Sequence, residues 1–232
     1  MRVAVLRSVR ISNTWLLADD EGRRFLIDTG HPLERPALAA ELWRAGVRRR
    51  GDLSAVLLTH RHSDHAGNAA WLRERFSCPV VAHPADAAIL EDRTERPALA
   101  GRGAPHFHEV LCRVEDRFPA RTVVDETLDD GETRFGFRAA SVAGHTEGSV
   151  LLFHEATGAL FSGDAILAGV PVQRLVTHLR FAVPEYSFDA EACARRARAF
   201  LASDPPVRTL CAGHGPMLRD AKRALGRLRS RR

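Results

Sequence analysis

The amino-acid sequence predicts an α/β protein in which two β-rich halves face each other and helices lie outside. Residues 3–28 read as three short strands joined by polar turns, and residues 34–90 alternate between helical and strand patterns. Residues 122–162 contain a second group of strands. Residue types that bind metals follow strands in both groups, so we expect the two halves to face each other across one site.

The first half is expected to contain strands at 3–6, 13–17, 24–28, 55–58 and 79–82. Leu38, Leu42 and Trp43 recur at helical spacing and predict a helix over 34–46. Periodic apolar residues after Asn68 predict a second helix. A third is expected to begin at 83–86, because proline suits the first turn of a helix.

The second half is expected to contain strands at 122–125, 133–141, 150–154, 159–162 and 208–212, and helices at 190–201 and 218–228. Between these elements, segments 94–120 and 165–188 lose their periodicity and are interrupted by proline and glycine. Both are therefore expected to be irregular loops. Loops of this length inside a compact domain are usually functional or mobile.

Composition indicates an ordinary globular protein of 232 residues, with 45% hydrophobic and 27% charged residues, and we expect one domain over 1–232. No apolar run approaches the roughly 20 residues that cross a bilayer, and the first apolar run is too short for a secretory signal. We therefore expect a cytoplasmic protein without a membrane partner. The net charge of +5 is spread among acidic residues, which gives no support to a nucleic-acid partner. The four cysteines lack C-x-x-C spacing and are expected to be reduced and mostly buried.

The segment Thr59–Gly67 carries the strongest chemical signal. His60, His62, Asp64 and His65 are four potential metal ligands within six residues, directly behind the apolar run 55–58. Side chains alternate along an extended segment, so His60 and His62 are expected to point the same way. Two imidazoles and a carboxylate at a strand end suit a divalent metal such as Zn²⁺, Fe or Mn.

Thr59–Gly67 resembles the T-H-x-H-x-D-H-x-G signature of the metallo-β-lactamase superfamily. Three further matches follow in the order of that family: Gly144–Ser149, Phe161–Asp164 and Gly213–Gly215. The resemblance implies a four-layer αββα sandwich with a dinuclear metal site. It assigns His60, His62 and His145 to one metal ion, Asp64, His65 and His214 to the other, and Asp164 to both.

Two divalent ions held in this way leave positions open for water and substrate, so the predicted enzyme is a dinuclear metallohydrolase with a metal-bound hydroxide as nucleophile. Zn²⁺ is favoured, and Fe or Mn are alternatives. Asp64 is the candidate catalytic residue, because its carboxylate could orient the hydroxide and later carry a proton. The sequence assigns no substrate-binding residue and no oligomeric state.

The expected substrate is a small ester, thioester or lactone. An aspartate at 164 resembles the glyoxalase II, lactonase and phosphodiesterase branches of the superfamily, so a phosphodiesterase remains an alternative. Only 18 residues follow His214, which leaves no room for the helical domain of glyoxalase II and disfavours a glutathione thioester. An alternative from another class is a persulfide dioxygenase-like enzyme with a single iron ion.

Four further positions have open roles. Asp28 either orients a ligating histidine or only forms a turn before Gly30. A structural role is favoured for His83. His106 and His108 have ligand-like spacing, but the expected ligand set is complete without them. Together with Phe107 and Phe118 they are candidates for a lid, since the corresponding region often shapes the substrate mouth in the superfamily.

Overall fold

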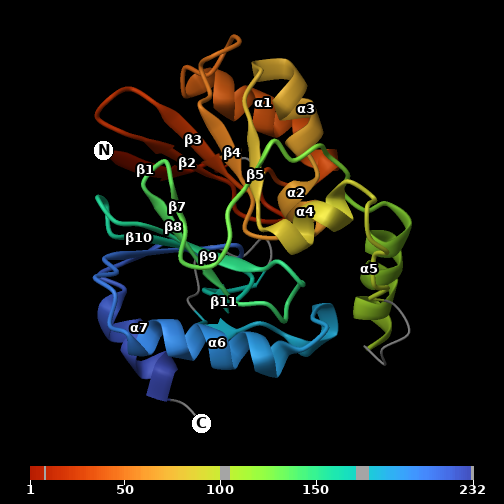
Figure 1. Ribbon diagram of the computed structural model, residues 1–232, viewed down its shortest axis with the longest axis vertical. Helices are drawn as coiled ribbons and strands as arrows, with labels where there is room; N and C mark the ends of the chain where they lie inside the picture. The colour runs from red at the N-terminus through yellow and green to blue at the C-terminus, as the bar shows by residue number, and fades with distance from the viewer. Residues whose placement is uncertain (8, 100–104, 171–177, 231–232) are drawn as a thin grey trace.

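Two six-stranded mixed sheets lie face to face, and helices cover their outer faces (Figure 1). The computed structural model describes residues 1–7, 9–99, 105–170 and 178–230. The first sheet has the order β1-β2-β3-β4-β5-β6 and the second the order β14-β13-β10-β9-β8-β7. This arrangement confirms the predicted αββα sandwich.

The strands of the first sheet are β1 (Arg2–Val5), β2 (Trp15–Ala18), β3 (Arg24–Ile27), β4 (Ala55–Leu57), β5 (Val80–Ala82) and β6 (Glu126–Thr127). Those of the second are β7 (Thr133–Arg134), β8 (Phe137–Ser141), β9 (Val150–His154), β10 (Ala159–Gly163), β13 (Thr209–Ala212) and β14 (Leu218–Arg219). A small third sheet pairs β11 (Ile166–Leu167) with β12 (Arg180–Phe181). The helices are η1 (Pro32–Glu34), α1 (Arg35–Arg44), α2 (Ser63–Ala66), α3 (Ala69–Phe76), α4 (Pro84–Leu90), α5 (His106–Arg117), η2 (Pro184–Tyr186), α6 (Ala190–Ala202) and α7 (Lys222–Ser230). None of the helices in the described ranges is long and apolar enough to cross a membrane.

The core is layered because both faces of each sheet are buried. Along β3, Phe25 and Ile27 pack between the sheets, whereas Leu26 packs outward with residues of α1 and α3. Phe161 of β10 meets Trp15 from the opposite sheet, with ring centroids 6.5 Å apart. Strands covered on both faces read as nearly continuous apolar runs, which is why the sequence reveals most of them.

Parallel strand pairs bring the candidate ligands to one edge of the sandwich. Strands β3 and β4 are parallel, so Asp28 and the Thr59–Gly67 segment leave the first sheet at the same edge. Strands β10 and β13 are also parallel, so Asp164 and His214 leave the second sheet together. The carboxyl ends of parallel strands are a common place for binding sites for this reason.

Several predicted elements are wrong in detail. No strand forms at 122–125, because the Val124 N–H bonds to the side chain of Glu91 instead of a neighbouring strand. Residues 133–141 form a hairpin rather than one strand, since Phe135 and Gly136 have positive φ angles of 52° and 82°. The last helix begins at Lys222, because Leu218 and Arg219 pair with β13.

The largest error concerns segment 94–120, which contains the helix α5. Pro105 occupies the position before the first helical residue and Pro119 follows the end, so these prolines bound a helix rather than exclude one. Phe107, Val110 and Phe118 are exposed, and Cys112 is the buried residue of the helix. The chain therefore lacks the usual pattern of a buried apolar face at this helix.

Candidate metal centre

The first ligand segment bends sharply between β4 and α3. His60 and His62 follow the strand, and the short helix α2 carries Asp64 and His65. A Cβ atom added at Gly67 would lie 2.2 Å from the carbonyl oxygen of Ser63, so the end of this segment requires glycine. The tight bend turns all four side chains toward the second sheet.

The structure brings all seven predicted ligand residues together at this edge. His60, His62 and His145 form one set of mutually close donor atoms, here called the histidine group. Asp64, His65 and His214 form another, the carboxylate group. Within each group the ligand atoms lie within 4.8 Å of one another.

Asp164 lies between the two groups. Its Oδ1 is 3.3 Å from His65 Nε2, and its Oδ2 is 3.3 Å from His214 Nε2. The same Oδ2 is 3.8 Å from His145 Nε2, in the other group. His60, His65 and Asp164 also form a close set of donors that joins the groups. This placement suits a carboxylate shared by two ions.

The donor atoms fit divalent cations better than they fit one another. The Nε2 atoms of His60 and His145 face each other at 3.2 Å, and the buried Nε2 of His62 has no hydrogen-bond partner within the described ranges. Buried polar atoms left without partners cost free energy. Converging nitrogen lone pairs, with a carboxylate beside them, are the donors that Zn²⁺ and related ions select.

Asp28 orients the ligand His65. Its Oδ2 lies 2.8 Å from His65 Nδ1, and its Oδ1 accepts a hydrogen bond of 2.8 Å from the Thr59 N–H. A proton held on Nδ1 leaves Nε2 free to bind a metal and raises its basicity. Asp28 also adopts a turn conformation, with φ of 57°. Both interpretations of this residue from the sequence therefore apply.

Ser187 does the same for His145, and the sequence does not reveal it. The Ser187 hydroxyl donates to the carbonyl oxygen of Val183 at 2.7 Å, so it accepts from His145 Nδ1 at 3.0 Å. His145 Nε2 then faces the metal centre. The serine stands in the irregular segment after Asp164, where no motif or spacing marks it.

A buried ionic cluster joins the two histidine-bearing segments, and it too was missed. Arg61 places Nε and Nη2 at 3.1 and 3.0 Å from one carboxylate oxygen of Glu147. Arg61 also lies 3.8 Å from Asp86 of α4, which accepts hydrogen bonds from Thr146 and the Gly148 N–H. Burial raises the pKa of Asp86, and this cost is offset by its hydrogen bonds and by Arg61. The cluster fixes the His145 segment against the His60 segment.

The other histidines lie outside both groups. His83 precedes α4 and accepts a hydrogen bond from the Ala85 N–H, which agrees with a structural role. His108 bonds to Tyr186 at 2.6 Å, and His106 is exposed. Phe107 and Phe118 are 70% and 67% exposed. The two phenylalanines are therefore largely exposed to solvent, and a role for them in a lid stays a prediction.

The two groups differ in their electrostatics. Burial lowers the pKa of His60 and His62 well below the ordinary value, and that of His145 to about 4. Burial also acts against charge on His65 and His214, but the nearby carboxylates outweigh it. They raise the pKa of His214 to about 9 and that of His65 well above its usual range.

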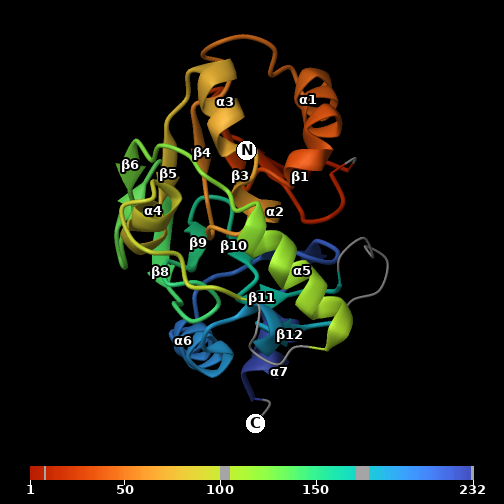
Figure 2. The ribbon, with the colours of Figure 1, turned by 90° about the vertical axis from the view of Figure 1, so that its right-hand side faces the viewer.

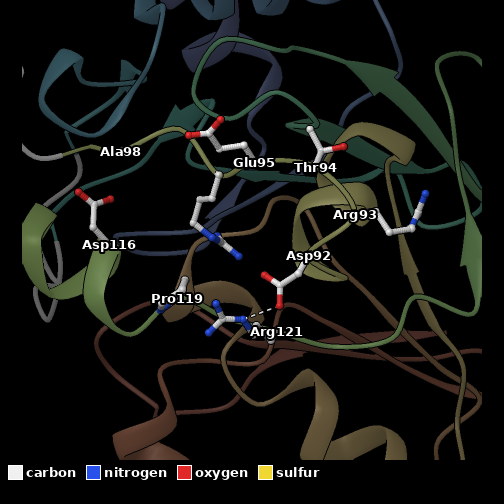
Figure 3. A pocket seen from close by; sticks show the side chains of 9 residues that line it. Asp92, Arg93, Thr94, Glu95, Ala98, Asp116, Pro119 and Arg121 are labelled. Atoms are coloured by element: carbon white, nitrogen blue, oxygen red, sulfur yellow. Dashed lines mark hydrogen bonds and ion pairs between the residues drawn. The ribbon is translucent and has the colours of Figure 1, made fainter.

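A polar cavity of about 430 Å³ lies apart from this centre, where the loop after α4 meets α5 and the segment that follows α5. Figure 3 shows Asp92 and Arg121 paired at its wall, at 2.7 Å. Asp116 of α5 also lines the cavity, and its carboxylate accepts from the Leu99 N–H at 2.9 Å. None of the seven candidate ligands lines this cavity, so it belongs to the attachment of α5 rather than to the metal centre.

The αββα sandwich and its paired His/Asp groups define a protein built to bind metal ions at one edge of two facing sheets. The sequence profile of the metallo-beta-lactamase superfamily matches residues 7–214, and the chain belongs to this superfamily.

Two curated relatives and two solved structures illustrate the similarity. A hydroxyacylglutathione hydrolase of Stenotrophomonas maltophilia (strain R551-3) is 30% identical over 192 residues, which are 78% of this chain and 59% of that protein. The probable metallo-hydrolase YybB of Bacillus subtilis (strain 168) is 27% identical over 67% of this chain and 62% of its own. The chain thus spans about three fifths of the length of these relatives.

Among solved structures, the crystal structure of BLEG-1 B3 metallo-beta-lactamase superposes with a TM-score of 0.67 at 23% identity, over 95% of both chains. TTHA1623 in a di-iron-bound form superposes with a TM-score of 0.63 at 27% identity, over 92% of both chains. These similarities agree with the observed fold.

Proposed function

We propose that this metallohydrolase cleaves a small ester, thioester or lactone at a centre of two divalent ions, with Zn²⁺ as the favoured metal. The observation that carries the proposal is the pair of adjacent donor groups with Asp164 between them. When bound, two such ions would supply a water that loses its proton near neutral pH and a Lewis acid for the carbonyl oxygen of the substrate.

The side chains of the protein have separate tasks in this proposal. The histidine group and the carboxylate group would each hold one ion, and Asp28 and Ser187 keep the ligating nitrogens of His65 and His145 free. Asp64 is the candidate acid or base. Its side chain is 24% exposed, compared with 14% for Asp164 and 0% for His65, so it is the acidic ligand with the best access to water and substrate.

Relatives support an acyl substrate without specifying it. Several are named hydroxyacylglutathione hydrolase, and the first of them extends well beyond the part that this chain matches. We therefore propose the acyl class and a small-molecule substrate, and we do not carry over the glutathione part. The four cysteines are buried thiols, which supports a reducing compartment such as the cytoplasm.

One experiment tests metal and reaction together. Protein purified without added metal is analysed for metal identity and stoichiometry, then assayed on esters, thioesters, lactones and phosphodiesters. Two Zn or Mn ions per chain with acyl hydrolysis are expected. Two iron ions would agree with the proposed centre and change only the metal, and iron is a real candidate because TTHA1623 is known in a di-iron form. No hydrolysis across the whole panel would refute the proposal.

The mononuclear iron oxygenase is the competing function. It needs two histidines and an aspartate around one iron ion, so four of the seven candidate ligands would have no ion to bind. Both groups are complete, and each contains a histidine that a neighbouring side chain orients, which favours the dinuclear hydrolase. One iron per chain with sulfur-dependent oxygen uptake would reverse this preference.

A further inference from the structure

Helix α5 is attached to the rest of the protein mainly through polar contacts. Figure 2 shows α5 crossing the side of the molecule between α2 and β12. His108 bonds to Tyr186, Cys112 donates to the Glu185 carbonyl oxygen, and Asp116 accepts from the Leu99 N–H. Glu115 contacts Ser63. Because few apolar residues of α5 are buried, these contacts define where the helix lies.

The contact between Glu115 and Ser63 joins α5 to the start of α2. Both carboxylate oxygens of Glu115 lie 3.1 Å from the Ser63 nitrogen, and the Ser63 hydroxyl donates to the same carboxylate. Ser63 is the first residue of α2, and the preceding residue, His62, provides no side-chain cap. The N–H groups of a first helical turn lack partners within the helix, and negative charge is favourable there.

Asp64 and His65 are the next two residues of α2. The contact between Glu115 and Ser63 therefore also fixes the position of their backbone. Asp28 holds the side chain of His65, and two further contacts of this short helix engage backbone carbonyl oxygens. The Ser12 hydroxyl donates to the oxygen of Asp64, and the Thr29 N–H donates to that of His65 at 2.6 Å. Glu115 is the side chain that secures the first N–H of α2. Its loss would release the first turn while the carbonyl contacts remain.

We propose that Glu115 is a positioning residue for the metal centre, which holds Asp64 and His65 in the arrangement that binds the metal ion of the carboxylate group. The inference rests on the proposed dinuclear function. The histidine group is supported differently, because His145 bonds to Ser187 and His60 lies 3.1 Å from the Thr59 hydroxyl. Loss of Glu115 should therefore lower the affinity for the ion of the carboxylate group much more than the affinity for the ion of the histidine group.

The test compares Glu115→Ala and Glu115→Gln with two controls on the same helix. Arg113→Ala changes a side chain that is 72% exposed, and Asp116→Ala removes a contact of α5 that does not involve α2. Metal stoichiometry and the affinity of each site are measured by elemental analysis and by competition with a chromophoric chelator. Thermal unfolding of the metal-free proteins reports whether each variant folds.

We expect Glu115→Ala to weaken binding of the carboxylate-group ion by about 10- to 100-fold, the usual range for residues that support metal ligands, and to leave binding of the histidine-group ion nearly unchanged. Glu115→Gln keeps one oxygen acceptor and should restore most of the affinity. Both controls should bind two ions as the parent does. Ser63→Ala, which removes only the hydroxyl contact, should give a smaller loss and serves if Glu115→Ala does not fold.

Two results would overturn the inference while the proposed function stands. One is that the Glu115→Ala variant binds each ion with the same affinity as the parent protein. The other is a Glu115→Ala variant that loses both ions to the same degree as Asp116→Ala. A parent protein that binds a single ion would instead refute the dinuclear function itself.

Discussion

His60, His62 and His145 make up a group without a carboxylate, whereas Asp64 joins His65 and His214 in the other group. The neighbours differ as well. A neutral hydroxyl, that of Ser187, supports His145, but the charged carboxylate of Asp28 supports His65. The two ions of one centre would therefore be held by differently built sites.

The difference affects the metal-free protein. In the histidine group, burial keeps the imidazoles neutral at pH 7, with their lone pairs ready for a cation. In the carboxylate group, protonated His65 and His214 neutralise Asp64 and Asp164 until metal arrives. We infer that the histidine group fills first and that the carboxylate group must release protons to fill.

The largest expected effect is that of Asp64→Asn. This substitution tests whether Asp64 acts as an acid or base in the reaction as well as a metal ligand. Turnover should fall by about 10²- to 10⁴-fold, the range for loss of a general acid or base, while metal content falls far less. Turnover and bound metal are measured on the same preparation. Equal losses of both would reduce Asp64 to a ligand and make the two groups functionally alike.

Asp28→Asn should have the next largest effect and should act on the carboxylate group. The amide keeps the shape but loses the charge that holds the Nδ1 proton of His65, so affinity for that ion should fall by about 10- to 100-fold. The histidine group should lose less, because Asp28 reaches it indirectly, through Thr59 and His65. Competition titrations that resolve two sites measure this, and a uniform loss would contradict the separation of the groups.

The pH dependence of metal binding should also separate the groups. Below pH 9, each proton displaced from the carboxylate group costs roughly a factor of ten in affinity per pH unit, because the pKa of His214 is raised to about 9. The histidine group should be nearly independent of pH above about 6. Calorimetry in buffers of different ionisation enthalpy counts the protons released at pH 7. Release upon binding the first ion, rather than the second, would reverse the inferred order.

The sequence predicts the ligands much better than it predicts their surroundings. All seven candidate ligands are visible because each lies in a short motif behind a strand, and the strands are visible because both faces of each sheet are buried. Helix α5 is missed although Phe107, Val110 and Val114 recur at helical spacing, because the prolines at its two ends predict a loop when they are taken as breaks within the segment. The hairpin at Phe135 is missed because a non-glycine residue adopts a positive φ there.

Partners of the ligands are missed for a different reason. Glu115 follows Ser63 by 52 residues and Ser187 follows His145 by 42, in segments without periodicity or motif. A single serine or glutamate has no local signal for such a contact, since the contact depends on how distant segments pack. Asp28 is the exception, because it stands before a glycine at the end of a strand.

Ser187→Ala should have the smallest effect and act on the histidine group alone. The substitution removes one neutral hydrogen bond to His145 Nδ1, worth about 1 kcal/mol, so affinity for the first ion should fall roughly fivefold. The carboxylate group should be unaffected, because Ser187 bonds to His145, which belongs to the histidine group. Ser203→Ala, at the end of α6, is a matched control that should leave both sites unchanged. The same two-site titration measures all three proteins. A loss of affinity for the ion of the carboxylate group would mean that the two groups are coupled through the η2 segment. The groups would then differ in their charge but would not be held in place independently.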